Sequence, residues 1–368
     1  MRRGRPFVAT GVALAALVAC GETSAPRDIP DAQEVLAAVH SPYDVPGMAG
    51  VVLDASGIID RAVVGVRRVG APDAIALGDR FHLGSNVKAM TATAIASVVE
   101  DGLISWTATA ESVFPELAAD IDPDLRSITL AQLLNHRGGI QPFTAAGEFG
   151  ALPPFSGTPM QQRAAFTAWL LEHGHGGPTG SFLYSNAGYS LAAAMAERVT
   201  GTAFEELLAS RVLAPLSITG TPGWPAATDA AQPWGHTGEN GIYFPENPQG
   251  VYQLPPIITP AGDLSMSIEN YARFVLVHLR ALRGQPELLS AASFQRMHTP
   301  DGPYAMGWAL GDLRGTPIYA HEGSAGTFHA VALIVPSSNI ATIVFVNAGG
   351  EDAGLAARTA ALELAGFR

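Results

Sequence analysis

Strand patterns occupy both ends of the chain, and helical patterns with Gly/Pro-rich loops fill the stretch between them. Near the N-terminus, two β-rich runs flank Asp54-Ala55-Ser56-Gly57 and predict a hairpin. Near the C-terminus, runs separated by turn residues predict successive strands at 306–313, 316–323, 326–336 and 339–349. This distribution predicts one mixed sheet closed by the two chain ends, with a helical insertion between them.

Helices are predicted on either side of these strands. One covers about 31–40, and another closes the chain from about 351. Residues 267–284 show an amphipathic pattern that ends at Gly284. The predicted fold class is therefore α/β in the α+β sense: a mixed, mainly antiparallel sheet flanked by helices, with a mostly helical subdomain.

Composition excludes several classes of protein. The 368 residues are 48% hydrophobic and 15% charged, which is typical of a globular chain with ample sequence for a large core. The net charge of −12, with no basic cluster beyond the first five residues, argues against a nucleic-acid partner. Cys20 is the only cysteine, which excludes an internal disulfide, a cysteine-based zinc site and a downstream thiol nucleophile.

The N-terminus has the pattern of a targeting segment. Three arginines within the first five residues precede an apolar run that ends at Cys20. Leu17-Val18-Ala19-Cys20 resembles a bacterial lipobox, which implies that residues 1–19 are a signal peptide, that the Cys20 thiol carries lipid, and that residues 20–30 form a tether. An ordinary cleaved signal is the alternative. We expect an exported chain that meets the membrane only through this anchor, because the apolar run is short for a spanning helix.

Lys88 is the only lysine in a chain that has 20 arginines. A guanidinium stays protonated in proteins, whereas a desolvated lysine can lose its proton and act as a base. Periodic apolar residues predict a helix over 85–100, in which Lys88 lies one turn from Ser85 and on nearly the same face.

Ser85 stands at the predicted start of this helix, where unpaired N–H groups favour negative charge. A serine becomes a good nucleophile when a neighbouring base takes its proton. The alternative is a helix-capping serine followed by a solvated lysine. The uniqueness of Lys88 favours a nucleophilic Ser85 with Lys88 as its general base.

These residues resemble the S-x-x-K motif of the penicillin-recognising serine hydrolases, in the branch of class C β-lactamases, D-alanyl-D-alanine carboxypeptidases and serine esterases. Tyr184-Ser185-Asn186 matches the family's second motif, Y-x-N, and 133–140, 260–274 and 304–310 also match family stretches. The resemblance implies a β-lactamase/transpeptidase-like domain over 31–368. Its sheet subdomain would comprise about 31–84 and 266–368, and its helical subdomain about 85–265.

The resemblance also implies a role for each motif residue. Ser85 would form an acyl-enzyme, Lys88 would take its proton, and Tyr184 would relay protons to the leaving group and activate water. Asn186 would bind Lys88 and the substrate's amide.

The family's third motif, K-T-G, is replaced here by His321-Glu322-Gly323-Ser324. His321 would position substrate but carries a charge only when protonated, near an ordinary pKa of about 6.5. Gly323 would let the strand approach the substrate closely, and the backbone N–H groups of Ser85 and Ser324 would form the oxyanion hole.

Three other patterns in the sequence could also indicate functional residues. Residues 188–192 nearly spell G-x-S-x-G, but no strand precedes them, so Ser190 is predicted to be a helix residue. His173 and His175 give a weak metal signal in a glycine-rich loop, and a surface loop is the preferred interpretation. Loop residues that could line the acyl pocket are Trp234, His236 and Tyr252.

The sequence as a whole predicts an exported serine acyl-hydrolase that uses no metal or organic cofactor. Its expected partner is a small-molecule or peptide substrate, and no pattern specifies an oligomeric state. The missing third-motif lysine ranks D-amino-acid peptides, peptidoglycan stems and small esters above β-lactams as substrates. A non-catalytic penicillin- or peptide-binding sensor on the same fold is the alternative.

Overall fold

The computed structural model describes residues 29–250 and 252–367. The predicted signal peptide and the lipidation site Cys20 lie outside the described residues. Within the described part of the chain, no helix is both long enough and apolar enough to cross a membrane.

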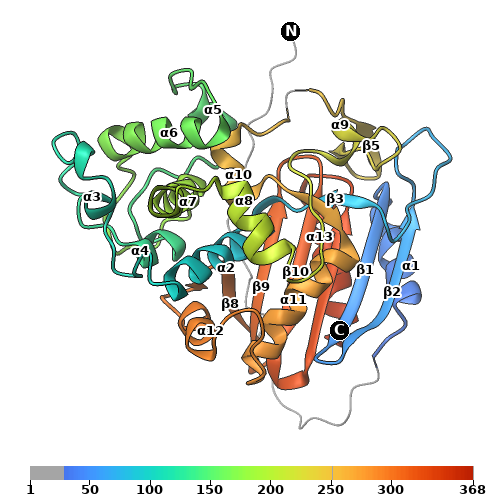
Figure 1. The fold of residues 1–368 in the computed structure, drawn as a ribbon. Coiled ribbons are helices and arrows are strands. Elements are labelled where there is room, and N and C mark those ends of the chain that lie inside the picture. The colour runs from blue at the N-terminus through green and yellow to red at the C-terminus, as the bar shows by residue number, and fades with distance from the viewer. Residues whose placement is uncertain (1–28, 251, 368) are drawn as a thin grey trace.

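A seven-stranded antiparallel sheet forms the centre of the fold, in the order β2-β1-β11-β10-β9-β8-β7 (Figure 1). Its strands are β1 (Gly47–Asp54), β2 (Gly57–Gly65), β7 (Tyr304–Ala305), β8 (Trp308–Leu313), β9 (Thr316–Ser324), β10 (His329–Val335) and β11 (Ile340–Val346). Residue Met48 lies opposite Val346, so β1 and β11 join the two ends of the chain. The predicted mainly antiparallel sheet is confirmed.

Two short ladders lie outside this sheet. The strand β3 (Arg80–His82) pairs with β6 (Ser265–Ser267), and β4 (His236–Glu239) pairs with β5 (Ile242–Pro245). The β3–β6 pair joins the segment just before Ser85 to the segment just after Asp263.

The helices of the described residues are α1 (Ala32–Tyr43), α2 (Val87–Glu100), α3 (Ala110–Val113), α4 (Leu130–Leu134), α5 (Ala146–Phe149), α6 (Pro159–His173), α7 (Asn186–Thr200), α8 (Phe204–Leu208), α9 (Pro225–Thr228), α10 (Thr259–Gly262), α11 (Ile268–Leu282), α12 (Ala291–His298) and α13 (Glu351–Leu364). Short 3₁₀ turns are η1 (Gly84–Asn86), η2 (Pro115–Leu117), η4 (Pro256–Ile258) and η5 (Pro336–Ser338), and η3 (Ala209–Leu213) is a π-helical turn. The helices predicted near both termini are present, and α11 ends two residues before Gly284.

Alternation along the strands gives the sheet two apolar faces. In β11, Val344 and Val346 pack with α1 and α13, whereas Ile343 and Phe345 pack on the opposite face with α11. A strand covered on both faces shows a nearly continuous apolar run, and the sequence of β11 has this pattern. Figure 1 shows α3, α4, α5, α6 and α7 grouped to one side of the sheet, with α2 between them and the strands.

The helix α2 is buried along almost its whole length, which is unusual for a helix of a globular protein. It packs against α7 and α10 on the helical side and shares a core with the sheet and α11. Its first turn, η1, meets the end of β9. The residues that begin α2 are therefore held by both halves of the fold.

Two glycines allow β9 to lie directly on η1. A Cβ on Gly323 would lie 2.0 Å from the Leu83 carbonyl oxygen and 2.7 Å from the Ser85 nitrogen. A Cβ on Gly84, whose φ is +51°, would lie 2.4 Å from the Ser324 nitrogen. Because backbone faces backbone on both sides, no side chain could move to relieve either contact.

We predict that Gly323→Ala lowers the free energy of unfolding by roughly 1–3 kcal/mol, because the added methyl group must push β9 away from η1. Chemical denaturation measures this change. Gly78→Ala is the matched control, since a Cβ there meets no atom within 4 Å. Equal stability of the two variants would contradict the close backbone approach at Gly323.

Candidate active site

Lys88 projects from the first turn of α2 into an interior with no solvent access, and its exposed fraction is 0%. Its Nζ lies 3.0 Å from Ser85 Oγ, 2.7 Å from Asn186 Oδ1 and 2.7 Å from the Ala261 carbonyl oxygen. In the described part of the chain it forms no ion pair with a carboxylate. Burial without such a partner lowers the pKa of Lys88 well below its usual value.

The three neighbours of Nζ determine where its hydrogens lie. A carbonyl oxygen and an amide oxygen can only accept hydrogen bonds, so a neutral amine donates its two hydrogens to Ala261 and Asn186. The assignment of Asn186 is supported by its Nδ2, which donates to the Phe143 carbonyl at 2.8 Å. The remaining lone pair of Nζ faces Ser85 Oγ, which can donate. The arrangement is that of a base ready to take the serine proton.

Ser85 itself is partly exposed, while the base behind it is shielded from water. Asn86, the next residue, donates from Nδ2 to the Ala330 carbonyl at 3.0 Å and accepts from the Tyr271 hydroxyl at 3.0 Å. These bonds fix the turn between β10 and α11. The nucleophile thus sits on a rigid turn at the surface of the core.

Tyr184 lies on the loop that enters α7, with its phenol oxygen near the Ser85 hydroxyl. Burial raises the pKa of Tyr184 above its usual value, so the phenol stays protonated and can donate. The Lys88 amine lies 4.9 Å from the centre of the phenol ring. The structure therefore brings Ser85 and Lys88 together with Tyr184 and Asn186. The two pairs lie about a hundred residues apart in the sequence.

His136 supports this phenol, and its role was not visible in the sequence. Its ring lies 4.1 Å from the Tyr184 ring, and its Nδ1 accepts from the Ser185 N–H at 3.1 Å. His136 takes a positive φ of 58°, which a β-carbon disfavours. Burial lowers the pKa of His136 well below its usual value. The matching stretch 133–140 marked this loop, but only the fold shows what the histidine contacts.

The predicted oxyanion donors lie where β9 crosses η1. Gly323 and Gly84, which precede Ser324 and Ser85, each pack against the backbone nitrogen of the opposite segment. The amides of Ser85 and Ser324 are therefore neighbours across this crossing. Such a pair of backbone donors suits the oxyanion of a tetrahedral intermediate.

His321 is buried beside this crossing, and both of its ring nitrogens have partners. Nδ1 donates to the Glu322 carbonyl at 2.8 Å, so Nε2 accepts from the Tyr304 hydroxyl at 2.8 Å. Burial lowers the pKa of His321 to about 3. At neutral pH the residue in the place of the family's lysine is an uncharged imidazole.

Glu322 points to the opposite face of β9, as strand alternation requires. Its carboxylate pairs with Arg358 of α13 at 2.8 Å and with His329 at 3.4 Å. It therefore contributes no charge to the side of the strand that faces Ser85.

The competing motifs are placed as follows. Ser190 is a buried residue of α7 whose hydroxyl donates to the Ile257 carbonyl at 2.6 Å. His173 ends α6 and stacks on Trp169, whereas His175 lies with Asp122 and Asp124, their nearest ligand atoms within 4.8 Å of one another. In the described part of the chain, these three exposed or half-exposed side chains form the group of three or more possible ligands that could coordinate a metal ion.

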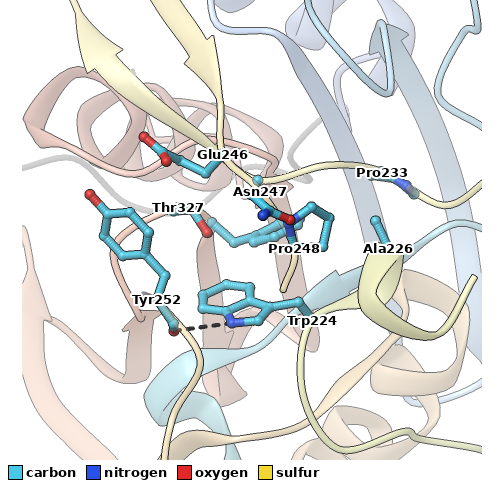
Figure 2. Close-up of a pocket in the computed structure, with 10 residues that line it drawn as sticks. Trp224, Ala226, Pro233, Glu246, Asn247, Pro248, Tyr252 and Thr327 are labelled. Carbon is cyan, nitrogen blue, oxygen red and sulfur yellow. Dashed lines mark hydrogen bonds between the residues drawn. The ribbon is translucent and has the colours of Figure 1, made fainter. Parts of the chain in front are cut away.

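The three residues expected in loops near the acyl pocket have different surroundings, and His236 begins the strand β4. Trp234 lies under the Arg68 guanidinium at 4.1 Å. His236 is buried, with Nδ1 against the Asn347 carbonyl at 2.7 Å. Tyr252 lines a pocket together with Trp224 (Figure 2).

A family model described as Beta-lactamase matches residues 32–366, which is nearly all of the described chain. The chain belongs to the β-lactamase family. Its resemblance to the penicillin-recognising serine hydrolases is thereby confirmed, and the protein is a serine hydrolase of this family.

The relatives that the chain resembles have names that refer to different activities. The chain is 26% identical over 332 residues to penicillin-binding protein 4 of Amycolatopsis lactamdurans, covering 86% of this chain and 84% of that protein. It is 31% identical over 171 residues to a lovastatin esterase of Penicillium rubens, covering 42% of each. Its fold is similar to an octameric penicillin-binding protein homologue from Pyrococcus abyssi, with a TM-score of 0.74, 21% identity, and coverage of 91% of this chain and 77% of that one.

The burial of Lys88 makes stability depend on pH. The unfolded chain keeps the lysine protonated below its ordinary pKa, whereas the folded chain holds it neutral, so the folded state gains stability as pH rises toward about 10.4. We predict that Lys88→Met is more stable than the wild type at neutral pH. Its advantage should shrink, by at most about 1.4 kcal/mol per pH unit, as pH increases.

Denaturation of both proteins from about pH 7.5 to about pH 9.5 measures this difference. Ser85→Ala, which keeps the amine, is the control and should follow the wild type. A difference between Lys88→Met and the wild type that stays constant with pH would mean that Lys88 is charged in the folded state.

Proposed function

We propose that the protein is an exported hydrolase that cleaves an amide or an ester through an acyl-enzyme on Ser85. The observation that carries the proposal is the fully buried Lys88 amine, whose Nζ lies 3.0 Å from Ser85 Oγ. As Oγ attacks the substrate carbonyl, Lys88 takes the serine proton and a tetrahedral oxyanion forms. The backbone N–H groups of Ser85 and Ser324 hold that oxyanion.

The leaving group departs with a proton supplied through Tyr184, which is then reprotonated from Lys88. Water next attacks the ester on Ser85, and the same two residues take its proton and return it to Oγ. Asn186 keeps the amine oriented throughout, because it binds Nζ at 2.7 Å. The cycle consumes one water and returns every protein group to its starting state.

The neutral third motif supports a ranking of substrates. A fixed cation beside the oxyanion hole would attract a substrate carboxylate, but His321 is uncharged and both its nitrogens are engaged. Small esters, and D-amino-acid peptides or peptidoglycan stems cleaved where no free carboxylate lies beside the bond, therefore rank above β-lactams, which carry one. The lovastatin esterase among the relatives is consistent with ester hydrolysis.

A turnover screen tests this assignment. Short p-nitrophenyl esters and D-alanyl peptides should be hydrolysed at least about tenfold faster than a chromogenic cephalosporin at equal concentration, a difference of about 1.4 kcal/mol in activation free energy. Ser85→Ala should abolish every reaction. Intact-mass measurement after fluorophosphonate labelling should show one adduct in the wild type and none in Ser85→Ala. A stable penicillin adduct with no turnover of any substrate would favour the sensor.

We also propose that the chain is a lipoprotein anchored through Cys20, on the strength of its lipobox-like segment. Full-length protein expressed in bacteria should partition into membranes, and its mass after signal removal should include acyl chains. Cys20→Ala should leave hydrolytic activity intact and move the protein out of the membrane fraction, because Cys20 lies outside the hydrolase domain. Release of wild-type protein without added mass would instead support an ordinary cleaved signal.

A further inference from the structure

His82 lies just before the catalytic turn, and the chemistry described above does not use it. It is the last residue of β3 and is 0% exposed. Its Nε2 lies 3.0 Å from Asp263 Oδ1, and its Nδ1 lies 3.3 Å from the backbone nitrogen of Gly84. Because both ring nitrogens are engaged inside the core, the imidazole has none to offer a substrate. Any effect of His82 on the reaction must pass through its two partners.

These partners determine where the hydrogen of the ring lies. The Gly84 N–H can only donate, so Nδ1 accepts, and the hydrogen of a neutral ring lies on Nε2, which donates it to Asp263. A second proton, on Nδ1, would face the Gly84 N–H donor to donor. Asp263, which is 7% exposed, therefore holds His82 in the tautomer that accepts from Gly84. The Asp263 carboxylate lies on the far side of the ring from Gly84.

The plane of the imidazole is held as well. Trp224 stacks on it, with ring centres 4.3 Å apart and an angle of 29° between the planes. Figure 2 shows what fixes this indole: its N–H donates to the Tyr252 carbonyl at 3.0 Å. Stacking and two hydrogen bonds thus give the Nδ1 acceptor of His82 a defined position.

The bond from His82 acts on the residue whose backbone orients an oxyanion donor. Gly84 has a φ of +51°, and its carbonyl carbon is bonded to the Ser85 nitrogen. Glycine has the widest choice of backbone angles, so its conformation must be fixed by its surroundings. On one side Gly84 packs against Ser324, and on the other its N–H is held by His82. The direction of the Ser85 N–H depends on both contacts.

The segment that carries Asp263 also serves the general base. Two positions earlier, the Ala261 carbonyl accepts from Lys88 Nζ at 2.7 Å. Between them, Gly262 packs on the catalytic turn, since a Cβ there would lie 3.1 Å from the Gly84 carbonyl carbon. One short segment thus aligns the base directly and the oxyanion donor through the imidazole.

We propose that Asp263 and His82 are positioning residues that orient the Ser85 N–H of the oxyanion hole. The proposal rests on the proposed function for the reaction that they serve. Acylation and deacylation both pass through a tetrahedral oxyanion, so a misdirected Ser85 N–H slows both steps and leaves substrate binding unchanged. A purely structural role would lower the stability of the protein but not the kcat of its folded form.

Two amide variants of His82 test the bond to Gly84. In His82→Asn, Oδ1 is attached to Cγ as Nδ1 is, so an acceptor for Gly84 remains. In His82→Gln, the amide reaches the place of Nε2 and can bind Asp263, but Gly84 loses its acceptor. Both variants lose the ring that stacks on Trp224, which makes them a matched pair.

With a p-nitrophenyl ester as substrate, we expect kcat of His82→Asn to stay within about threefold of the wild type. His82→Gln should have a kcat at least about tenfold lower, and both variants should keep KM within about twofold of the wild type. Equal kcat values in the two variants, or a loss confined to KM, would overturn the proposal.

Variants of Asp263 test the other end of the pair. Asp263→Asn can still accept from Nε2 and should keep kcat near the wild type, whereas Asp263→Ala releases the tautomer and should lower kcat about three- to tenfold. His298→Gln is the control, because it removes another buried imidazole, whose Nε2 lies 2.9 Å from His278 Nδ1. It should lower the free energy of unfolding and leave kcat unchanged. An equal loss of kcat in this control would contradict a specific role for His82.

Nitrogen-15 NMR of the histidines separates this inference from the proposed function. In Ser85→Ala, the His82 ring should carry its hydrogen on Nε2, and adding Asp263→Ala should remove that preference. The opposite tautomer in Ser85→Ala would overturn the proposal. If the wild type hydrolyses nothing, the proposed function is rejected and the catalytic role of His82 with it, while the hydrogen-bonded pair stands. Hydrolysis with a kcat indifferent to the acceptor at position 82 would reject the positioning role alone.

Discussion

The burial of one amine next to one hydroxyl is the constraint on which the site depends. A charged amine in this interior would need a carboxylate partner. The buried guanidinium of Arg163 has such partners. Arg163 is paired with Glu197 at 2.6 Å and Glu205 at 2.7 Å. Lys88 instead meets an amide oxygen, a carbonyl and a serine. The fold accommodates arginine as an ion and lysine as a base.

The same constraint explains the packing around α2. A neutral amine still has two hydrogens to satisfy, and an unmet donor in the interior costs about 1–3 kcal/mol. The acceptors come from α10 and α7, both of which must stay in register with α2. A hydroxyl of α2 adds a second link, since Thr91 donates to the Pro260 carbonyl at 2.7 Å. The positions of α7 and α10 relative to α2 are thus constrained by the hydrogen bonds of Lys88.

Much of this arrangement could be predicted from local sequence. Helix periodicity placed Lys88 one turn after Ser85, and alternation predicted the strand that carries Gly323. The contacts that depend on the whole fold could not be predicted, because no local pattern specifies them. The Ala261 carbonyl is a backbone group, the contact between the His136 and Tyr184 rings joins two separate loops, and the neutrality of His321 follows from its burial.

The catalytic centre carries no formal charge before substrate binds, so it cannot select substrates by their charge. The amine, the phenol of Tyr184 and the imidazole of His321 are neutral together, and the oxyanion donors are backbone N–H groups. Charge appears at this centre only as the tetrahedral intermediate forms, so fixed dipoles favour the transition state over the bound substrate. A substrate's own charge finds no partner at the bond that is cleaved. Selectivity by charge must therefore arise from groups outside this centre.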